Sequence, residues 1–395
     1  MRLALRAALL LNLVQVFTAV SMLSVPVLAP AIAADLGVST TLLGAYSAIL
    51  WSGGLVTSLA AGAIIARLGP LRTAQASLVL CALGLAAGAH GSLAALAVLP
   101  ALVGFGCGVE TPAASQLLAR VTRPAERPFV FSLKQTGVQL GGMLTGLAMP
   151  ALLPWTGWRG ALALGAALAL AYAAAIEPVR RRHEANVARG AHRPGGLGAL
   201  LRRVFGTPRL RQLAAASFAF HAMQISLNGF LVSFLVTAVG LPLAAAGMLL
   251  ALAQFGGFVG RLASGVVTGR RLPARAVLAA TGFAMATAAV VVGLAAAAMP
   301  LGVLALACLL FGLTASGWNG VFFAEIVHEA PVEDVGLVTG GMLLTAYAGL
   351  IVGPLAFGAV AEVAGYALAY AFIALWAAAG ATVLLRRPAV GVRTR

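Results

Sequence analysis

Three ionisable residues, Glu110, Lys134 and Arg261, stand inside long apolar runs of the chain. Counted from the nearest basic loop at the helical rise of about 1.5 Å per residue, they lie about 15, 9 and 13 Å deep. A charge at the centre of a bilayer costs roughly 2.5 to 3.5 kcal/mol, so each of the three is a candidate for function. Lys134 is also the only lysine in the sequence, which otherwise uses arginine.

The chemistry open to these residues is anion binding and proton transfer. A guanidinium binds a carboxylate through two parallel hydrogen bonds and an ammonium adds a point charge, so Arg261 and Lys134 are predicted to bind substrate. Glu110 is either a proton carrier or a plain salt-bridge partner, and His221 is a second proton-coupling candidate unless it only packs. The alternatives are that Lys134 extends to the lipid headgroups and that Arg261 clamps helix carbonyls or Glu110.

The sequence around these residues is that of a membrane protein. Only 9% of its residues are charged and 61% are apolar, whereas about a quarter of a typical soluble domain is charged. Apolar runs of about 18 residues or more can cross the hydrocarbon layer of roughly 30 Å as helices. We therefore predict an all-α membrane protein with twelve transmembrane helices, near residues 8–33, 40–66, 73–90, 93–119, 128–153, 160–176, 212–237, 243–268, 276–297, 300–325, 335–361 and 366–385.

The basic residues favour one side of the predicted membrane. If both termini are cytoplasmic, almost all of the 26 Lys and Arg residues fall in inside segments and only Arg159 falls outside, as the positive-inside rule requires. A nucleic-acid-binding face would need a soluble basic module, and no polar stretch is long enough for one. The net charge of +16 is thus explained by topology, and we expect a bilayer rather than a nucleic acid as partner.

The first 34 residues have a second interpretation. Arg2, Arg6, the apolar run after them and the small residues 29–34 resemble a cleavable signal peptide. We favour a first transmembrane helix, because the apolar run is too long for a signal peptide and its removal would leave an odd number of spans.

The chain is built from a six-span unit used twice. Gly37–Arg72 aligns with Gly240–Arg275 without a gap. Because six is even, both copies enter the membrane from the same side, and a pseudo-twofold axis along the membrane normal relates them. We predict an N-terminal six-helix bundle at 1–176, a cytoplasmic linker at 177–211 and a C-terminal six-helix bundle at 212–395. The residues that recur are Gly37, Gly44, Gly53, Gly54, Gly62, Arg67, Pro70 and Arg72, opposite Gly240, Gly247, Gly256, Gly257, Gly265, Arg270, Pro273 and Arg275.

The loop after the second span carries a family signature. Gly62-x-x-x-Ala66-Arg67-x-Gly69-x-x-Arg72, with a weaker copy from Gly265 to Arg271, resembles the Gly-x-x-x-Asp-Arg-x-Gly-Arg-Arg loop of the major facilitator superfamily. The acidic residue of that signature is replaced by Ala66. The resemblance covers the whole chain and implies the major facilitator fold, with an inner gate at this loop. The predicted gate residues are Arg67, Arg72, Arg120, Arg270, Glu325 and Glu329, where the acids either pair with inner arginines when the mouth closes or are simply solvated.

The resemblance also indicates a substrate class. In the superfamily the fifth and eighth helices meet between the two halves, which would bring Lys134 and Arg261 to one cleft. A cation in the eighth helix with a second cation in the cavity is similar to the monocarboxylate and oxalate transporters, in which such residues hold the substrate carboxylate. Near the midplane we expect four further residues to line the cleft, or else to pack between helices: Tyr46, Asn228, Trp318 and Asn319.

The predicted function is that of a bacterial inner-membrane permease, acting as a monomer, which moves a small organic anion with proton coupling by alternating access. The alternative is an efflux pump for amphiphilic compounds, in which Glu110 engages a cationic drug and the two cations belong to the inner gate. A channel, or a receptor with the same fold, is less favoured. The sequence contains no nucleotide-binding loop, metal-ligand cluster or catalytic triad, so we expect neither an enzyme nor a bound cofactor.

Overall fold

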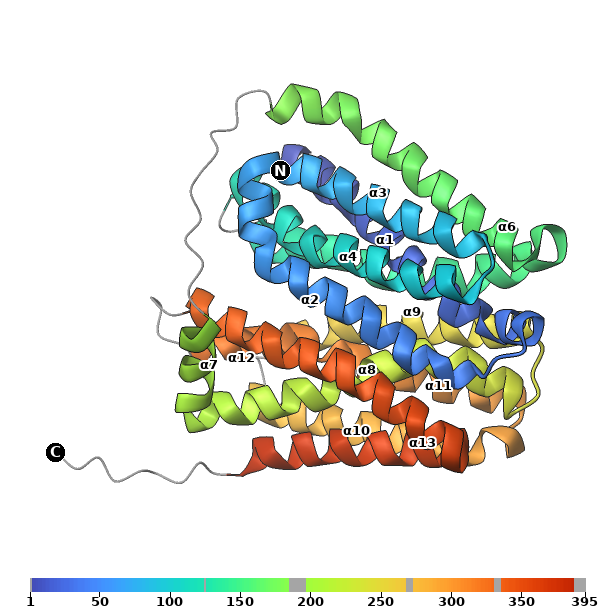
Figure 1. The fold of residues 1–395 in the computed structure, drawn as a ribbon. Helices are drawn as coiled ribbons and strands as arrows, with labels where there is room; N and C mark the ends of the chain where they lie inside the picture. Colours follow the sequence, from blue (N-terminus) through green and yellow to red (C-terminus); the bar gives the residue numbers. More distant parts are fainter. Residues whose placement is uncertain (1, 124–125, 185–196, 268–272, 330–334, 387–395) are drawn as a thin grey trace. The chain divides into compact units, whose positions relative to one another are not determined.

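The computed structural model describes residues 2–123, 126–184, 197–267, 273–329 and 335–386, and in these ranges the chain is helical without any strand (Figure 1). Only helices and closed barrels satisfy every backbone hydrogen bond inside hydrocarbon, and the predicted all-α class is confirmed. The α-helices are α1 (Arg2–Leu36), α2 (Leu43–Leu68), α3 (Pro70–Ala89), α4 (Leu93–Val121), α5 (Arg127–Gln135), α6 (Gly137–Glu184), α7 (Leu197–Gly206), α8 (Pro208–Thr237), α9 (Leu243–Val267), α10 (Ala274–Ala295), α11 (Leu301–Gly317), α12 (Asn319–Glu329) and α13 (Val335–Leu385), and short 3-10 turns span Thr40–Leu42 and Ala296–Ala298.

Ten helices of the described chain are long and apolar enough to cross a membrane. Two of them, α6 and α13, have 48 and 51 residues, although about 20 suffice for one crossing. Each contains a glycine with a left-handed φ, a conformation that glycine adopts without penalty: Gly157 at 64° and Gly365 at 82°. The chain changes direction there, so α6 and α13 each consist of two arms. These turns support the predicted count of twelve spans, which stays a prediction.

Large apolar side chains cover the outer faces of the helices. Val56, Leu168 and Leu375 are 59%, 50% and 68% exposed. Such a surface is unfavourable in water and neutral against lipid tails. The chain is therefore an integral membrane protein.

The structure divides into two compact units. The N-terminal unit comprises the described residues within Met1–Pro194 and Asn228–Gln254, and the C-terminal unit comprises those within Gly195–Leu227 and Phe255–Arg395. The C-terminal part of α8 and the N-terminal part of α9 thus group with the N-terminal segment of the chain. The division into a linker and two six-helix bundles stays a prediction.

The repeat seen in the sequence has a counterpart in the packing of each unit. In the N-terminal unit α2 approaches α4 at Gly53, where an added Cβ would lie 3.0 Å from the Ala101 carbonyl oxygen. In the C-terminal unit α9 approaches α11 at Gly256, where an added Cβ would meet the Leu309 carbonyl oxygen even more closely. Gly53 and Gly256 are partners in the sequence alignment, so both copies use the same small residue for the same close helix contact.

Two of the predicted spans are interrupted, which the sequence analysis did not foresee. The fifth span breaks at Thr136, between α5 and α6, and the tenth breaks at Trp318, between α11 and α12. A break frees backbone carbonyls that must find other donors away from water. Each break therefore needs polar side chains from its neighbours, and the charged residues of the spans lie at these two places.

Candidate functional site

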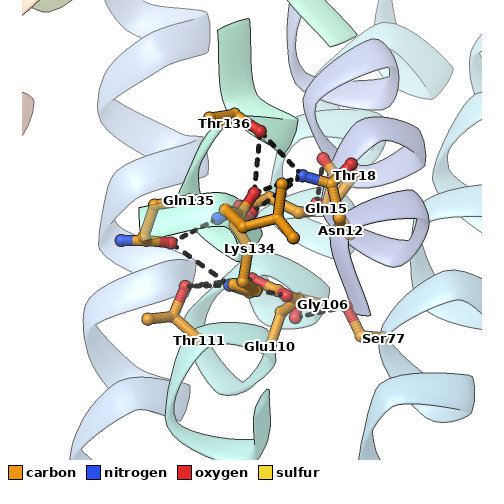
Figure 2. A network of polar contacts seen from close by, with 11 residues as sticks. Asn12, Gln15, Thr18, Ser77, Gly106, Glu110, Thr111, Lys134, Gln135 and Thr136 are labelled. Atoms are coloured by element: carbon orange, nitrogen blue, oxygen red, sulfur yellow. Dashed lines mark hydrogen bonds and ion pairs between the residues drawn. The ribbon is translucent and has the colours of Figure 1, made fainter. Parts of the chain in front are cut away.

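The centre of the N-terminal unit is a buried ion pair between Lys134 and Glu110. The Lys134 Nζ lies 2.9 Å from Glu110 Oε1 and 3.0 Å from Oε2, and both side chains are 4% exposed (Figure 2). Lys134 comes from the last turn of α5 and Glu110 from the middle of α4. The ammonium is directed into the unit rather than toward the headgroups, and Glu110 has a salt-bridge partner.

A shell of neutral polar groups surrounds the pair. The Lys134 ammonium also donates to Thr111 Oγ1 and to Gln135 Oε1, each at 3.3 Å, and the Thr111 hydroxyl donates to Glu110 Oε2 at 2.9 Å. Gln15 of α1 donates from Nε2 to Gln135 Oε1 at 2.9 Å. Thr111 and Gln135 are only half-buried, whereas the pair is fully buried. Among the contacts of the Lys134 ammonium, the two neutral residues, Thr111 and Gln135, are therefore more accessible than Glu110.

Asn12 of α1 caps the break beside the ion pair. Its Nδ2 donates to the carbonyl oxygens of Leu133 and Lys134, at 2.8 and 3.1 Å, and lies 3.0 Å from Thr136 Oγ1 (Figure 2). Thr136 itself donates to the Leu133 carbonyl at 2.7 Å. These contacts satisfy the carbonyls at the end of α5, where the helix is interrupted at Thr136.

The second interrupted helix lies in the C-terminal unit, and Arg261 caps it. The Arg261 Nε donates to the Ser316 carbonyl at 3.2 Å, and Asn319 Nδ2 reaches the same oxygen at 3.3 Å. Ser264 of α9 donates to the Gly317 carbonyl at 2.6 Å. The clamp on helix carbonyls, one of the two roles left open for Arg261, is therefore present. Lys134 and Arg261 belong to different units, and their common cleft stays a prediction.

Trp318 stands at the break itself. It is fully buried, and its indole N–H donates to the Ala315 carbonyl at 3.0 Å. The His221 ring meets its face edge-on, with centroids 4.7 Å apart, and His221 Nδ1 lies 2.8 Å from the Ser217 carbonyl oxygen. The Ser217 hydroxyl oxygen lies 3.3 Å from the same nitrogen. Asn319 donates to Gln224 Oε1 at 3.3 Å. The structure thus brings together Arg261, His221, Trp318 and Asn319.

The other two residues predicted to line a cleft lie in the N-terminal unit. The Tyr46 hydroxyl, on a buried side chain, donates to the Met22 carbonyl at 3.4 Å. Asn228 accepts from Gln254 Nε2 at 3.3 Å through its Oδ1 and is half-buried. These contacts are with Met22 and Gln254, and the role of Tyr46 and Asn228 at a substrate site stays a prediction.

Three of the predicted gate residues, Arg72, Glu325 and Glu329, form ion pairs inside their own unit. Arg72 lies 3.5 Å from Glu177, at the end of α6. Glu325 and Glu329 pair with Arg275, at 2.9 and 3.5 Å, and Glu329 also lies 3.1 Å from Arg209. Arg67 and Arg120 are exposed in the last turns of α2 and α4, and Arg270 lies outside the described residues. The two acids thus pair with Arg275 and Arg209 of their own unit.

The signature loop owes its shape to Gly69. This residue has φ 84°, and its N–H donates to the Ile65 carbonyl at 2.8 Å to end α2 directly before Pro70 begins α3. The copy of this turn, which includes Arg270, lies outside the described residues.

Several functional contacts were not assigned from the sequence. Asn12 and Gln15 were visible only as polar residues in an apolar run, and Thr111 and Ser264 are too common in membrane helices to stand out. Arg275 was recognised as part of the repeat but not as the partner of Glu325. A residue that caps a break can be found only after the break is known.

Comparisons with known proteins agree with this architecture. The chain matches the Major Facilitator Superfamily over residues 10–346. A human protein, the voltage-gated purine nucleotide uniporter SLC17A9, is 41% identical over 58 residues, which are 15% of this chain and 13% of that protein.

Solved transporters share the fold along nearly the whole chain. A POT family transporter in complex with 5-aminolevulinic acid has a TM-score of 0.76 at 13% identity, covering 96% of this chain and 95% of that one. A bacterial homolog of the human lysosomal transporter Spinster has a TM-score of 0.71 at 16% identity, covering 95% and 93%.

Helical architecture, membrane-length spans and the charged residues at interrupted helices are those of a membrane transport protein. The chain belongs to the Major Facilitator Superfamily, as the signature loop predicted.

Proposed function

We propose that the chain is a secondary active transporter that moves a small organic anion, a carboxylate, together with a proton. The observation that carries this proposal is the buried pair of Lys134 and Glu110. Removing one partner of a buried ion pair leaves an uncompensated charge, at a cost of about 3–5 kcal/mol. The Lys134 ammonium therefore needs an anion beside it in every state of the transport cycle.

This need for charge compensation links the proton to the substrate. When Glu110 takes a proton onto a carboxylate oxygen it becomes neutral, and Lys134, which keeps its charge, binds the substrate carboxylate instead. When the substrate leaves, Glu110 releases the proton and the ion pair forms again. The linkage is reciprocal, so each ligand strengthens the binding of the other. One monovalent anion then travels with one proton, and this transport is electroneutral.

Arg261 is the second proposed contact of the anion, because a guanidinium that now donates to a backbone carbonyl can exchange this acceptor for a carboxylate, which is a stronger one. Tyr46, Asn228, Trp318 and Asn319 are proposed to shape the cleft, and His221 is a second candidate for the proton. The human relative is named for purine nucleotides, which are anions, and 5-aminolevulinic acid, bound by one structural neighbour, is a carboxylic acid. The first name agrees with an anionic substrate and the second with a carboxylate.

We favour this function over an amphiphile efflux pump. A pump of the predicted kind would present Glu110 to a cationic compound, whereas its carboxylate already lies within 3.0 Å of the Lys134 ammonium. The charge asymmetry of the loops supports a bacterial inner membrane with both termini in the cytoplasm, and we propose that the transporter acts as a monomer.

Uptake of labelled monocarboxylates and dicarboxylates into proteoliposomes tests the proposal. Under an inside-alkaline pH gradient the wild type is expected to accumulate at least one of them, and Lys134→Ala and Arg261→Ala to lower the rate at least about tenfold, the effect of about 1.4 kcal/mol. Arg181→Gln, at a side chain that is 75% exposed, is the control and should retain uptake. Wild-type rates in both cation variants would overturn the anion assignment. Drug resistance conferred on an exporter-deficient strain, without carboxylate uptake, would favour the pump.

A further inference from the structure

α1 meets the break between α5 and α6 through two side chains on one face. Asn12 and Gln15 stand one helical turn apart, so they point the same way from α1. Asn12 Nδ2 holds the backbone of the last α5 turn, at the carbonyls of Leu133 and Lys134. Gln15 Nε2 holds the Gln135 side chain, which in turn accepts from Lys134 Nζ. Backbone and side chain at the end of α5 are thus both bonded to α1 (Figure 2).

α1 and the start of α6 also touch directly beside the break. A Cβ added to Gly137, the first residue of α6, would lie 2.6 Å from the Asn12 carbonyl oxygen and 2.9 Å from Gln15 Cβ. No real side chain fits at such distances, so glycine is required for α1 to reach the break. Asn12 and Gln15 are 6% and 4% exposed, and their hydrogen bonds are therefore shielded from competition by water.

We infer that Asn12 and Gln15 are positioning residues that hold the end of α5 so that the Lys134 ammonium reaches both oxygens of Glu110. Lys134 is the second-last residue of α5, and its carbonyl is one of the two that Asn12 binds. The Lys134 side chain is long and flexible, so its ammonium is held beside Glu110 only if the backbone of α5 is itself held in place. The clamp holds this backbone in place. The inference deepens the proposed function, since the same clamp would set how firmly the ammonium is held until a substrate arrives.

Hydrogen exchange of the purified full-length protein tests the clamp without any substrate. Asn12→Ala is expected to raise the exchange rate of the peptide covering 130–137 by roughly tenfold or more, because it removes both hydrogen bonds that hold the carbonyls at the end of α5. Gln15→Leu removes only the side-chain contact and should give a smaller rise in the same peptide. Tyr172→Phe is the control: it deletes a hydrogen bond from α6 to the Leu10 carbonyl of α1, at 2.9 Å, without touching the break.

A double-mutant cycle shows whether the clamp acts through the ion pair. If it does, Glu110→Gln raises exchange in the same peptide, and Asn12→Ala with Glu110→Gln raises it by clearly less than the product of the two single effects. If Asn12→Ala misfolds, the cycle of Gln15→Leu with Glu110→Gln decides the point in its place. Unchanged exchange in both clamp variants, or effects that multiply as independent ones do, would overturn the inference. Because this readout needs no transport, its failure is distinguishable from failure of the proposed anion transport.

Discussion

The two units treat a buried cation in different ways. In the N-terminal unit Lys134 is matched by a full negative charge, with Glu110 Oε1 at 2.9 Å, and the pair is shielded from solvent. In the C-terminal unit Arg261 is half-buried, and its Nε donates to a neutral acceptor, the Ser316 carbonyl, at 3.2 Å. A proton on the Glu110 carboxylate would remove the negative charge that balances Lys134. The Ser316 carbonyl does not take up a proton at physiological pH, so protonation cannot free Arg261 in the same way. We therefore propose that Glu110 of the first unit carries the proton, and that Arg261 of the second unit joins Lys134 in binding the anion.

The largest expected effect comes from breaking the N-terminal pair on one side. Lys134→Leu leaves the Glu110 carboxylate buried without its cation, and the loss of stability should be about 3–5 kcal/mol. Thermal unfolding of the purified protein measures it. Lys134→Leu combined with Glu110→Leu removes both charges and should recover most of the melting temperature. A double variant that is less stable than the single one would show that the pair is not the reason for the loss.

A smaller effect is expected at the C-terminal cation. Arg261→Leu removes the hydrogen bond from Nε to the Ser316 carbonyl, to which Asn319 Nδ2 also donates, so we expect a loss of about 1–3 kcal/mol. The same melting experiment compares the two units directly. If Arg261→Leu proved as damaging as Lys134→Leu, Arg261 would also be matched by an anion, and the contrast between the units would disappear.

The repeated glycines Gly53 and Gly256 allow the helix packing of the two units to be compared. Gly256→Ala should destabilise by about 1–3 kcal/mol, because the Leu309 backbone cannot move away from the new methyl group. Gly53→Ala should cost less, since an added Cβ there lies 3.0 Å from the Ala101 carbonyl oxygen and needs only a small shift. Equal melting temperatures for the two variants would contradict the closer approach of α9 to α11.

The smallest effects belong to the ion pairs at the helix ends. Arg72 is 53% exposed and lies 3.5 Å from Glu177, so Arg72→Gln should change stability by less than about 1 kcal/mol, and high salt should remove the effect. Arg275 is 19% exposed beside Glu325, which is 8% exposed, so Arg275→Gln should cost more and depend less on salt. Melting curves at low and high ionic strength measure both losses. A larger loss of stability for Arg72→Gln than for Arg275→Gln would contradict this expectation.

The class of fold could be predicted because a membrane-spanning helix requires a long apolar run and the loops on one side of the predicted membrane are rich in arginine. The family signature and the glycine repeat also follow from local residues, and the family assignment is confirmed. Two breaks escaped prediction, since neither Thr136 nor Trp318 is a helix breaker by type. Both breaks depend on partners far along the chain, Asn12 for the first and Arg261 for the second.

The candidate site was predicted in its charged members but not in its pairing. Glu110 and Lys134 were marked by the cost of burying them, and sequence alone left Glu110 between a proton carrier and a salt-bridge partner. The structure shows that Lys134 is the partner of Glu110, and under the proposed function the same carboxylate also carries the proton. Neutral residues such as Gln15 carry no such cost and gave no signal.

The central claim is that protonation of Glu110 makes Lys134 available to a substrate carboxylate. The direct test compares Glu110→Gln with the wild type in proteoliposomes, by pH-gradient-driven accumulation and by exchange of labelled for unlabelled carboxylate at equal pH on both sides. Because glutamine imitates the protonated acid, the variant should exchange substrate at a rate near the wild type, yet fail to accumulate it against a gradient. Accumulation by Glu110→Gln at the wild-type level would contradict the account.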